Sequence, residues 1–231
     1  MPRYKDPCKV SLQQLYRRLF RAFGPQRWWP ATSSFEVMVG AILTQATNWR
    51  NVEVAITRLK QAGFLSPRKL VTIPSQRLEA FITPAGYFRQ KARRLREFSA
   101  WYLKRWGGNA RRLFKTPWRA LREQLLELNG IGPETADSIL LYAGNQPVFV
   151  VDAYTTRVFY RHGLIDGRAS YEEIQRFAMK RLPRNASLYN EFHALLVAVG
   201  KQYCHRRDPD CAHCPLGDLP RIREVKRYGL S

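Results

Sequence analysis

Apolar residues recur along this chain at helical spacing and almost never alternate over a long stretch, and this limits its fold most. Leucines and phenylalanines repeat every three or four positions over residues 12–23, and the pattern ends at Gly24. Ser33 and Glu36 match the capping-box pattern of a helix start, ahead of residues 35–43, which are apolar on most sides. The sequence therefore predicts an all-α protein in which this second helix lies in the middle of a bundle.

Further helical patterns cover residues 51–60, 78–81, 87–105 and 117–128, each closed by glycine, proline or asparagine. Residues 146–151 are the best candidate for a strand. Because that run is short and isolated, we expect an extended connection there and no sheet.

The chain is strongly basic, with 39 lysines and arginines against 18 acidic residues and a formal net charge of +21. Such a balance predicts a polyanionic partner. Because 29 of the basic residues are arginine, whose planar group grips phosphate through two bonds, nucleic acid is favoured over a membrane surface. No apolar run approaches the roughly 20 residues that would span a bilayer, and the first residues lack a signal-peptide core. We expect a cytoplasmic protein, associated with the nucleoid through DNA.

A glycine-rich run, LNGIGPETAD, lies at residues 128–137 between two helical patterns. Its two glycines flank one apolar residue and allow a tight turn whose backbone N–H groups point outward, immediately before a new helix. Gly-x-Gly alone also occurs in ordinary connectors, but the longer string favours a helix-hairpin-helix that binds phosphate. The DNA-binding candidates are Gly130, Ile131, Gly132 and Thr135.

An aspartate, Asp152, follows an apolar run in the sequence VDAYTTRV, and Gln45 lies upstream in ILTQATN. With the hairpin, these motifs resemble the helix-hairpin-helix DNA glycosylases of the endonuclease III superfamily. The resemblance covers about residues 30–215, and the order and separation of the motifs are more specific than any one of them.

The resemblance implies two helical domains with a cleft between them, and cleavage of the N-glycosidic bond of a base flipped out of duplex DNA. We expect residues 27–145 to form a six-helix domain with the hairpin. Residues 1–26 and 146–231 would form a discontinuous helical domain with the catalytic Asp and the cysteines. Asp152 would stabilise the positively charged sugar, although it would also cap a helix well. Gln45 would fill the gap left by the base, and we expect a monomer on damaged DNA.

Glu134 stands where bifunctional members of this superfamily carry a lysine. A carboxylate cannot form the Schiff base that leads to strand cleavage, so we expect a monofunctional enzyme without AP-lyase activity. Glu134 is either a solvated acid in the first turn of its helix or a partner for the base.

Tryptophans help to choose the substrate. Paired tryptophans are often core residues. Here, however, the sequence Trp28-Trp29-Pro30 and the aromatic Trp49, four residues after Gln45, stand beside the other motifs. This combination resembles the 3-methyladenine DNA glycosylases of the endonuclease III type, which hold the damaged base between aromatic rings. An alkylated purine is positively charged, which strengthens stacking and weakens the glycosidic bond, so no general acid is needed and no well-placed histidine is expected in this segment. The substrate-binding candidates are Trp28, Trp29, Pro30, Gln45, Trp49 and Glu134.

We therefore expect release of alkylated purines: 3-methyladenine first, with 7-methylguanine as a second candidate. The alternatives are a glycosylase for mismatched or oxidised bases, or a protein that binds damage without catalysis.

Three cysteines follow the spacing C-x6-C-x2-C, at Cys204, Cys211 and Cys214. They match three of the four positions of the family's iron–sulfur loop. The fourth position is Pro220, so this loop alone cannot hold a [4Fe–4S] cluster through four cysteines. Cys8 could supply the last thiolate, and the other candidates are His205, His213, Asp218 or an outside ligand. We expect a [4Fe–4S] cluster on an incomplete loop, with zinc held by three cysteines and a histidine, or no metal, as alternatives.

Overall fold

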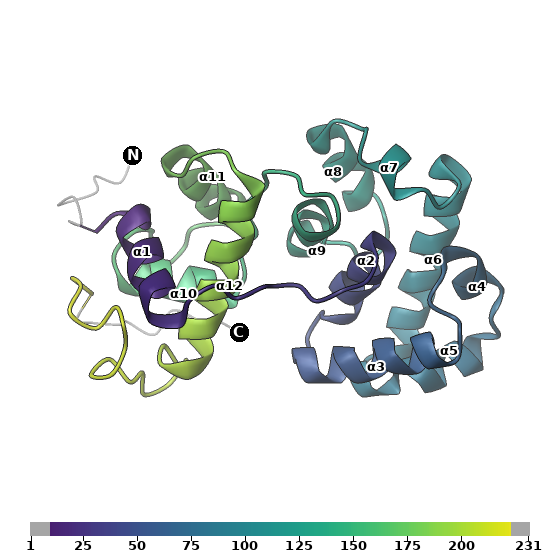
Figure 1. Cartoon of the computed structure of the whole chain (residues 1–231), viewed down its shortest axis with the longest axis horizontal. Coiled ribbons are helices and arrows are strands. Elements are labelled where there is room, and N and C mark those ends of the chain that lie inside the picture. Colours follow the sequence, from purple (N-terminus) through teal and green to yellow (C-terminus); the bar gives the residue numbers. More distant parts are fainter. Residues whose placement is uncertain (1–9, 223–231) are drawn as a thin grey trace. The chain divides into compact units, whose positions relative to one another are not determined.

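The computed structural model describes residues 10–222, which form twelve α-helices, one 3₁₀ turn and one π-helical turn without any strand (Figure 1). The prediction of an all-α fold is confirmed. Contacts between Cα atoms divide the chain into two units. Unit 1 contains residues 1–28 and 147–231, and unit 2 contains residues 29–146.

Unit 2 holds eight α-helices instead of the expected six, because two short helices, α4 and α7, interrupt its loops. Its elements are α2 (Ser34–Leu43), α3 (Trp49–Gln61), α4 (Pro67–Thr72), α5 (Ser75–Ile82), η1 (Thr83–Ala85), α6 (Phe88–Trp106), α7 (Ala110–Leu113), α8 (Trp118–Leu126), α9 (Pro133–Ser138) and η2 (Ile139–Ala143). The helical pattern expected after the glycine-rich run includes the π-helical turn η2, which Gly144 closes by donating to the carbonyl of Ile139 at 3.2 Å.

Helix α2 lies in the core of unit 2, as its apolar pattern predicts. Every residue from Phe35 to Leu43 is buried, including Glu36. Ser33 caps the helix by accepting a hydrogen bond from the backbone N–H of Glu36 at 3.2 Å. The helix that is apolar on most sides is therefore the one around which the others pack.

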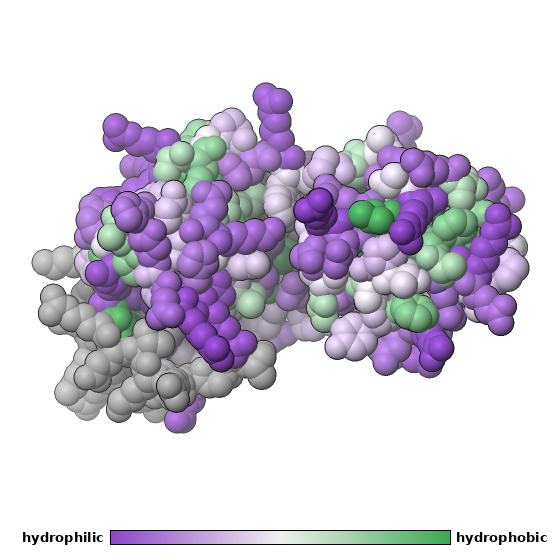
Figure 2. All heavy atoms as spheres, turned by 90° about the horizontal axis from the view of Figure 1, so that it is seen from below, coloured by the Kyte–Doolittle hydropathy of each residue, from purple (hydrophilic) through white to green (hydrophobic). Residues whose placement is uncertain are grey.

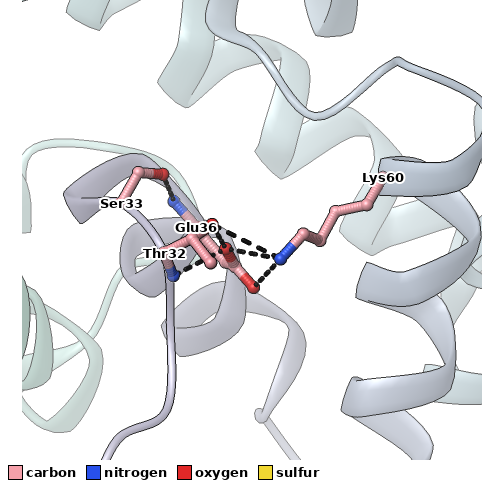
Figure 3. Close-up of polar contacts among 4 residues, drawn as sticks. All are labelled: Thr32, Ser33, Glu36 and Lys60. Atoms are coloured by element: carbon pink, nitrogen blue, oxygen red, sulfur yellow. Dashed lines mark hydrogen bonds and ion pairs between the residues drawn. The ribbon is translucent and has the colours of Figure 1, made fainter.

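Only the Ser33 half of the expected capping box forms, because the carboxylate of Glu36 bonds elsewhere (Figure 3). It accepts hydrogen bonds from the backbone N–H and hydroxyl of Thr32, at 3.0 and 2.6 Å, and not from the backbone of Ser33. Lys60 on α3 approaches both carboxylate oxygens at 3.1 Å. Burial raises the pKa of Glu36, but the bonds from Thr32 and the ammonium of Lys60 outweigh burial and lower this pKa overall.

Helix α6 is the longest element and carries a buried lysine. The ammonium of Lys91 donates to the backbone carbonyls of Leu43, at the end of α2, and Ala85, in η1, at 2.9 and 2.7 Å. Burial and the nearby Arg94 lower the pKa of Lys91 to about 8. Lys91 thus joins two segments that end near one another in unit 2. Tyr87, at the start of α6, is exposed and has a left-handed φ of 45°.

Unit 1 is built from α1 (Leu12–Phe23), α10 (Ala153–Arg161), α11 (Tyr171–Arg181) and α12 (Ala186–Gln202). Its core contains Phe149, Phe159 and Phe192, whose rings contact one another. Residues 146–151 form no regular element, in agreement with the extended connection that we expected. Hydrophilic side chains cover most of the face shown in Figure 2, which fits the strongly charged composition.

Candidate active site

The predicted hairpin is formed by α8, a short turn and α9. Gly130 has a φ of +77°, a conformation that only glycine adopts readily, and Ile131 is buried beneath the turn. Helix α9 begins directly after Gly132. Arg122 on α8 binds the buried carboxylate of Asp137 on α9 through two hydrogen bonds of 2.7 and 3.1 Å. This ion pair fixes the two helices of the hairpin to each other.

Gln45, just past the end of α2, contacts this hairpin. Its amide N–H group donates to the carbonyl of Gly130 at 2.8 Å and to the hydroxyl of Thr135 at 2.9 Å. Its amide oxygen accepts from the guanidinium of Arg94 at 2.6 Å. The structure thus brings together Gln45, Gly130 and Thr135. The hydroxyl of Thr135 is thus occupied as an acceptor for the amide of Gln45.

An aromatic cluster in unit 2 contains two of the predicted tryptophans. The ring of Trp29 contacts Trp49 edge-on, with 4.8 Å between the ring centres. Its centre lies 4.9 Å from that of Tyr142 in η2. Gly40 of α2 lets Trp29 approach closely, because a Cβ there would lie 3.0 Å from that ring. All three aromatic residues are half-buried, so each keeps part of its surface accessible.

The remaining pocket candidates are more dispersed. Trp28 belongs to unit 1, where the ammonium of Lys201 lies 5.9 Å from the centre of its ring. Pro30 is exposed in unit 2. Glu134 is exposed in the first turn of α9, the position that the solvated-acid interpretation requires.

Asp152 is the N-cap of α10. Its Oδ1 accepts a hydrogen bond from the backbone N–H of Thr155 at 2.7 Å. Its Oδ2 lies 3.5 Å from Nε2 of His193 on α12, a buried side chain. Burial raises the pKa of Asp152, but His193 and the Thr155 bond outweigh burial and lower it below the usual value. The carboxylate is therefore anionic near neutral pH.

Comparison with known proteins decides the family. Residues 39–184, more than half of the chain, match the family described as HhH-GPD superfamily base excision DNA repair protein. The chain belongs to the HhH-GPD superfamily. The general function of this HhH-GPD protein is therefore base excision repair of DNA by a glycosylase.

Relatives and solved structures agree with this assignment. The chain is 43% identical over 210 residues to MJ1434 of Methanocaldococcus jannaschii, which bears the name of a DNA repair glycosylase, and the match covers 90% of this chain and 94% of that one. The structure of Helicobacter pylori 3-methyladenine DNA glycosylase (MagIII) bound to 1,N6-ethenoadenine is similar with a TM-score of 0.73 and 29% identity, covering 84% of this chain and 98% of that one.

A trapped endonuclease III–DNA covalent intermediate has the same fold, with a TM-score of 0.77 and 24% identity over 90% of this chain and 94% of that one. The expected endonuclease III-like fold is thus confirmed. Within residues 10–222, no helix is long and apolar enough to cross a membrane.

The three cysteines of this HhH-GPD protein line one cavity of about 550 Å³ in unit 1. Two arginines of α10 hold the loop that carries them. Arg157 donates to the carbonyl of Cys204 at 2.7 Å, and Arg161 donates to its sulfur at 3.1 Å and to the carbonyl of His205 at 2.7 Å. Burial raises the pKa of Cys214.

A four-cysteine cluster does not fit these residues. Cys8, the candidate fourth thiolate, lies outside the described residues. Pro220, at the family's fourth position, directs its carbonyl to Nδ1 of the buried His162 at 2.9 Å. Across residues 10–222, no three cysteine, histidine, aspartate or glutamate side chains are arranged to hold a metal ion. The expected cluster is therefore not supported by the described part of the chain.

Three residues of this arrangement were not predicted from the sequence: His193, Tyr142 and Arg94. His193 lies on α12, outside the segment for which no histidine was expected, and α12 brings it to Asp152. No local signal in the sequence shows that side chains of α12 and η2 meet Asp152 and Trp29.

Proposed function

We propose that this protein is a monofunctional DNA glycosylase that hydrolyses the N-glycosidic bond of alkylated purines flipped out of double-stranded DNA. Its preferred substrates would be 3-methyladenine and 7-methylguanine. The cluster of Trp29, Trp49 and Tyr142 carries the proposal, because half-buried aromatic faces suit a flat, positively charged base. MagIII, whose fold is similar, is a 3-methyladenine glycosylase and binds an adenine derivative in its structure.

Asp152 would act on the sugar of the same nucleotide. As the bond breaks, the electron pair leaves with the cationic base, which becomes neutral, and positive charge develops on the sugar. The lowered pKa of Asp152 keeps its carboxylate negative, so that it stabilises this charge and orients a water molecule. Water adds to the sugar carbon and one proton is released to solvent. Because the base leaves neutral, no side chain needs to protonate it.

Glu134 supports hydrolysis without strand cleavage. Endonuclease III forms a covalent intermediate with DNA, as its trapped structure is named. Here the exposed carboxylate of Glu134 stands where bifunctional members of the superfamily carry the lysine nucleophile, and a carboxylate cannot form an imine with the sugar. Borohydride treatment should therefore trap no covalent complex, and an adduct with the unchanged protein would overturn this part of the proposal.

The remaining candidates would hold the DNA. The hairpin backbone at Gly130, Ile131, Gly132 and Thr135 would bind phosphate, and Gln45 would occupy the gap. Trp28 and Pro30 would border the nucleotide. The net charge of +21 predicts that binding weakens steeply with salt.

Release of bases from methylated duplex DNA tests the proposal. We expect 3-methyladenine and 7-methylguanine to be released, and Trp49→Ala to slow release more than Trp118→Ala, which removes a half-buried tryptophan outside the cluster. A panel with mismatched and oxidised bases tests the other substrate classes. Release of those bases alone would replace the proposed substrate, and tight binding without any release would favour a damage-binding protein.

A further inference from the structure

Gln45 is held on both sides of its amide group. The N–H group bonds to the carbonyl of Gly130 and the hydroxyl of Thr135, and the oxygen accepts from Nη1 of Arg94 at 2.6 Å. These three contacts fix which end of the amide faces the hairpin. The contact with Arg94 involves a charged donor and is the shortest of the three, as expected for a charge-assisted bond.

Arg94 also lies directly on the hairpin turn. A Cβ built on Gly130 would meet Nε of Arg94 at 2.0 Å and its Cδ and Cζ at 2.6 Å. Gly130 thus has a second reason to be glycine besides its positive φ, because any side chain would displace the guanidinium. A planar guanidinium can lie flat against this surface, whereas a lysine offers a single point charge on a flexible stem.

One polar group of Arg94 is left without a hydrogen bond. Its Nε is buried and has no acceptor in the structure, although the side chain as a whole is only half-buried. Folded proteins rarely bury a donor in this way unless its position serves another purpose. Here the unsatisfied Nε lies in a side chain that contacts both Gln45 and Gly130, which suggests that the position of the guanidinium serves these two contacts.

We propose that Arg94 is a positioning residue that holds the amide of Gln45 against the hairpin in the orientation needed for filling the gap. This inference rests on the proposed role of Gln45 in filling the gap left by the extruded base. Without Arg94, the amide oxygen of Gln45 loses the hydrogen bond that it accepts from the guanidinium. Insertion of Gln45 into the gap then becomes less favourable, while the hairpin still binds phosphate.

A double-mutant cycle tests this role. The probe is a duplex with a tetrahydrofuran abasic analogue and 2-aminopurine next to it, whose fluorescence reports how the gap is filled. At saturating protein, we expect Gln45→Ala and Arg94→Met each to remove the same part of the fluorescence change, and the double variant to remove no more. Single-turnover release of 3-methyladenine should fall roughly tenfold in each single variant and no further in the double variant.

Arg93→Met is the matched control. Arg93 is the neighbouring arginine on α6, and it is exposed and contacts only Glu97 among the ion pairs of the described residues, at 3.7 Å. Its replacement removes the same charge, so it should keep the fluorescence change at saturation. Losses that multiply in the double variant, or equal effects of Arg93→Met and Arg94→Met, would overturn the proposal.

Two further features keep the test decisive. Arg94→Lys retains the positive charge but not the planar group, and we expect it to lose part of the fluorescence change. If Arg94→Met fails to fold, a full fluorescence change with folded Arg94→Lys would contradict the inference. The abasic duplex contains no bond for the enzyme to cleave, so the fluorescence assay tests the role of Arg94 independently of base release. Absence of base release would refute the proposed function only.

Discussion

Nε2 of His193 lies 3.5 Å from Oδ2 of Asp152, so the candidate catalytic carboxylate contacts a buried residue of α12 as well as the helix that it caps. His193 lowers the pKa of Asp152 against the effect of burial. We therefore expect His193→Asn to raise this pKa and to move the acidic limb of the pH–rate profile to higher pH, with little change at pH 8. Single-turnover release of 3-methyladenine between pH 4 and 9 measures this, and an unmoved limb would show that His193 does not set the ionisation.

Asp152 serves both as a helix cap and as the candidate catalyst, and two substitutions separate these roles. Asparagine caps a helix about as well as aspartate, so Asp152→Asn should change stability little but reduce base release by about 10² to 10³-fold. Asp152→Ala should lose activity and also about 1 kcal/mol of stability. Urea unfolding and single-turnover assays compare them, and release by Asp152→Asn at the wild-type rate would exclude a catalytic charge here.

Sequence patterns predict most helices because their signals are local. Caps such as Ser11 and Ser33, and the glycines of the hairpin, mark helix ends within one or two residues. Contacts between distant segments have no such signal. The pairs Asp152–His193 and Arg94–Gln45 depend on how helices pack, and Tyr142 reaches Trp29 through a π-helical turn that no pattern predicts. The sequence therefore identifies the catalytic candidate better than the residues around it.

Glu36 should make the stability of unit 2 depend on acidic pH. Because its folded pKa is lowered, its contribution is complete above the ordinary glutamate value of about 4.3 and is lost as pH falls toward the folded pKa. We expect Glu36→Gln to cost about 1–3 kcal/mol at pH 7, since a buried set of hydrogen bonds to a charged group is lost. The cost should shrink below about pH 4. Urea unfolding at both pH values checks this, and a cost independent of pH would contradict it.

Lys91 should make stability depend on pH in the same direction as Glu36, but in the alkaline range. Its folded pKa of about 8 lies below the ordinary lysine value, so protonation favours the unfolded chain, and its contribution to stability rises between about pH 8 and 10.4. Lys91→Met removes this titration together with the bonds to Leu43 and Ala85. The difference in unfolding free energy between the wild type and this variant should therefore grow by up to about 3 kcal/mol over that range. A constant difference would mean that Lys91 titrates normally.

The cysteine loop should keep its structure when metal is removed, because two arginines of α10 hold its backbone. Arg161 donates to the carbonyls of His205 and Arg206, at 2.7 and 3.2 Å, and Arg157 to that of Cys204. Trypsin cleavage after the exposed Arg206 measures how often the loop opens. We expect a chelator to leave the cleavage rate unchanged and Arg161→Met to raise it roughly tenfold, since bonds from a charged donor are lost.

Arg176→Met is the control for that cleavage experiment, because it removes an exposed arginine of α11 in the same unit and should leave cleavage of the loop unchanged. A metal that holds the loop would give the opposite pattern, with faster cleavage after chelation and the same effect in Cys214→Ser. Iron and sulfide analysis of anaerobically purified protein, with its visible spectrum, would then distinguish a cluster from zinc. Since the described residues supply three thiols, a confirmed cluster would require its fourth ligand to come from outside residues 10–222 or from a rearranged side chain.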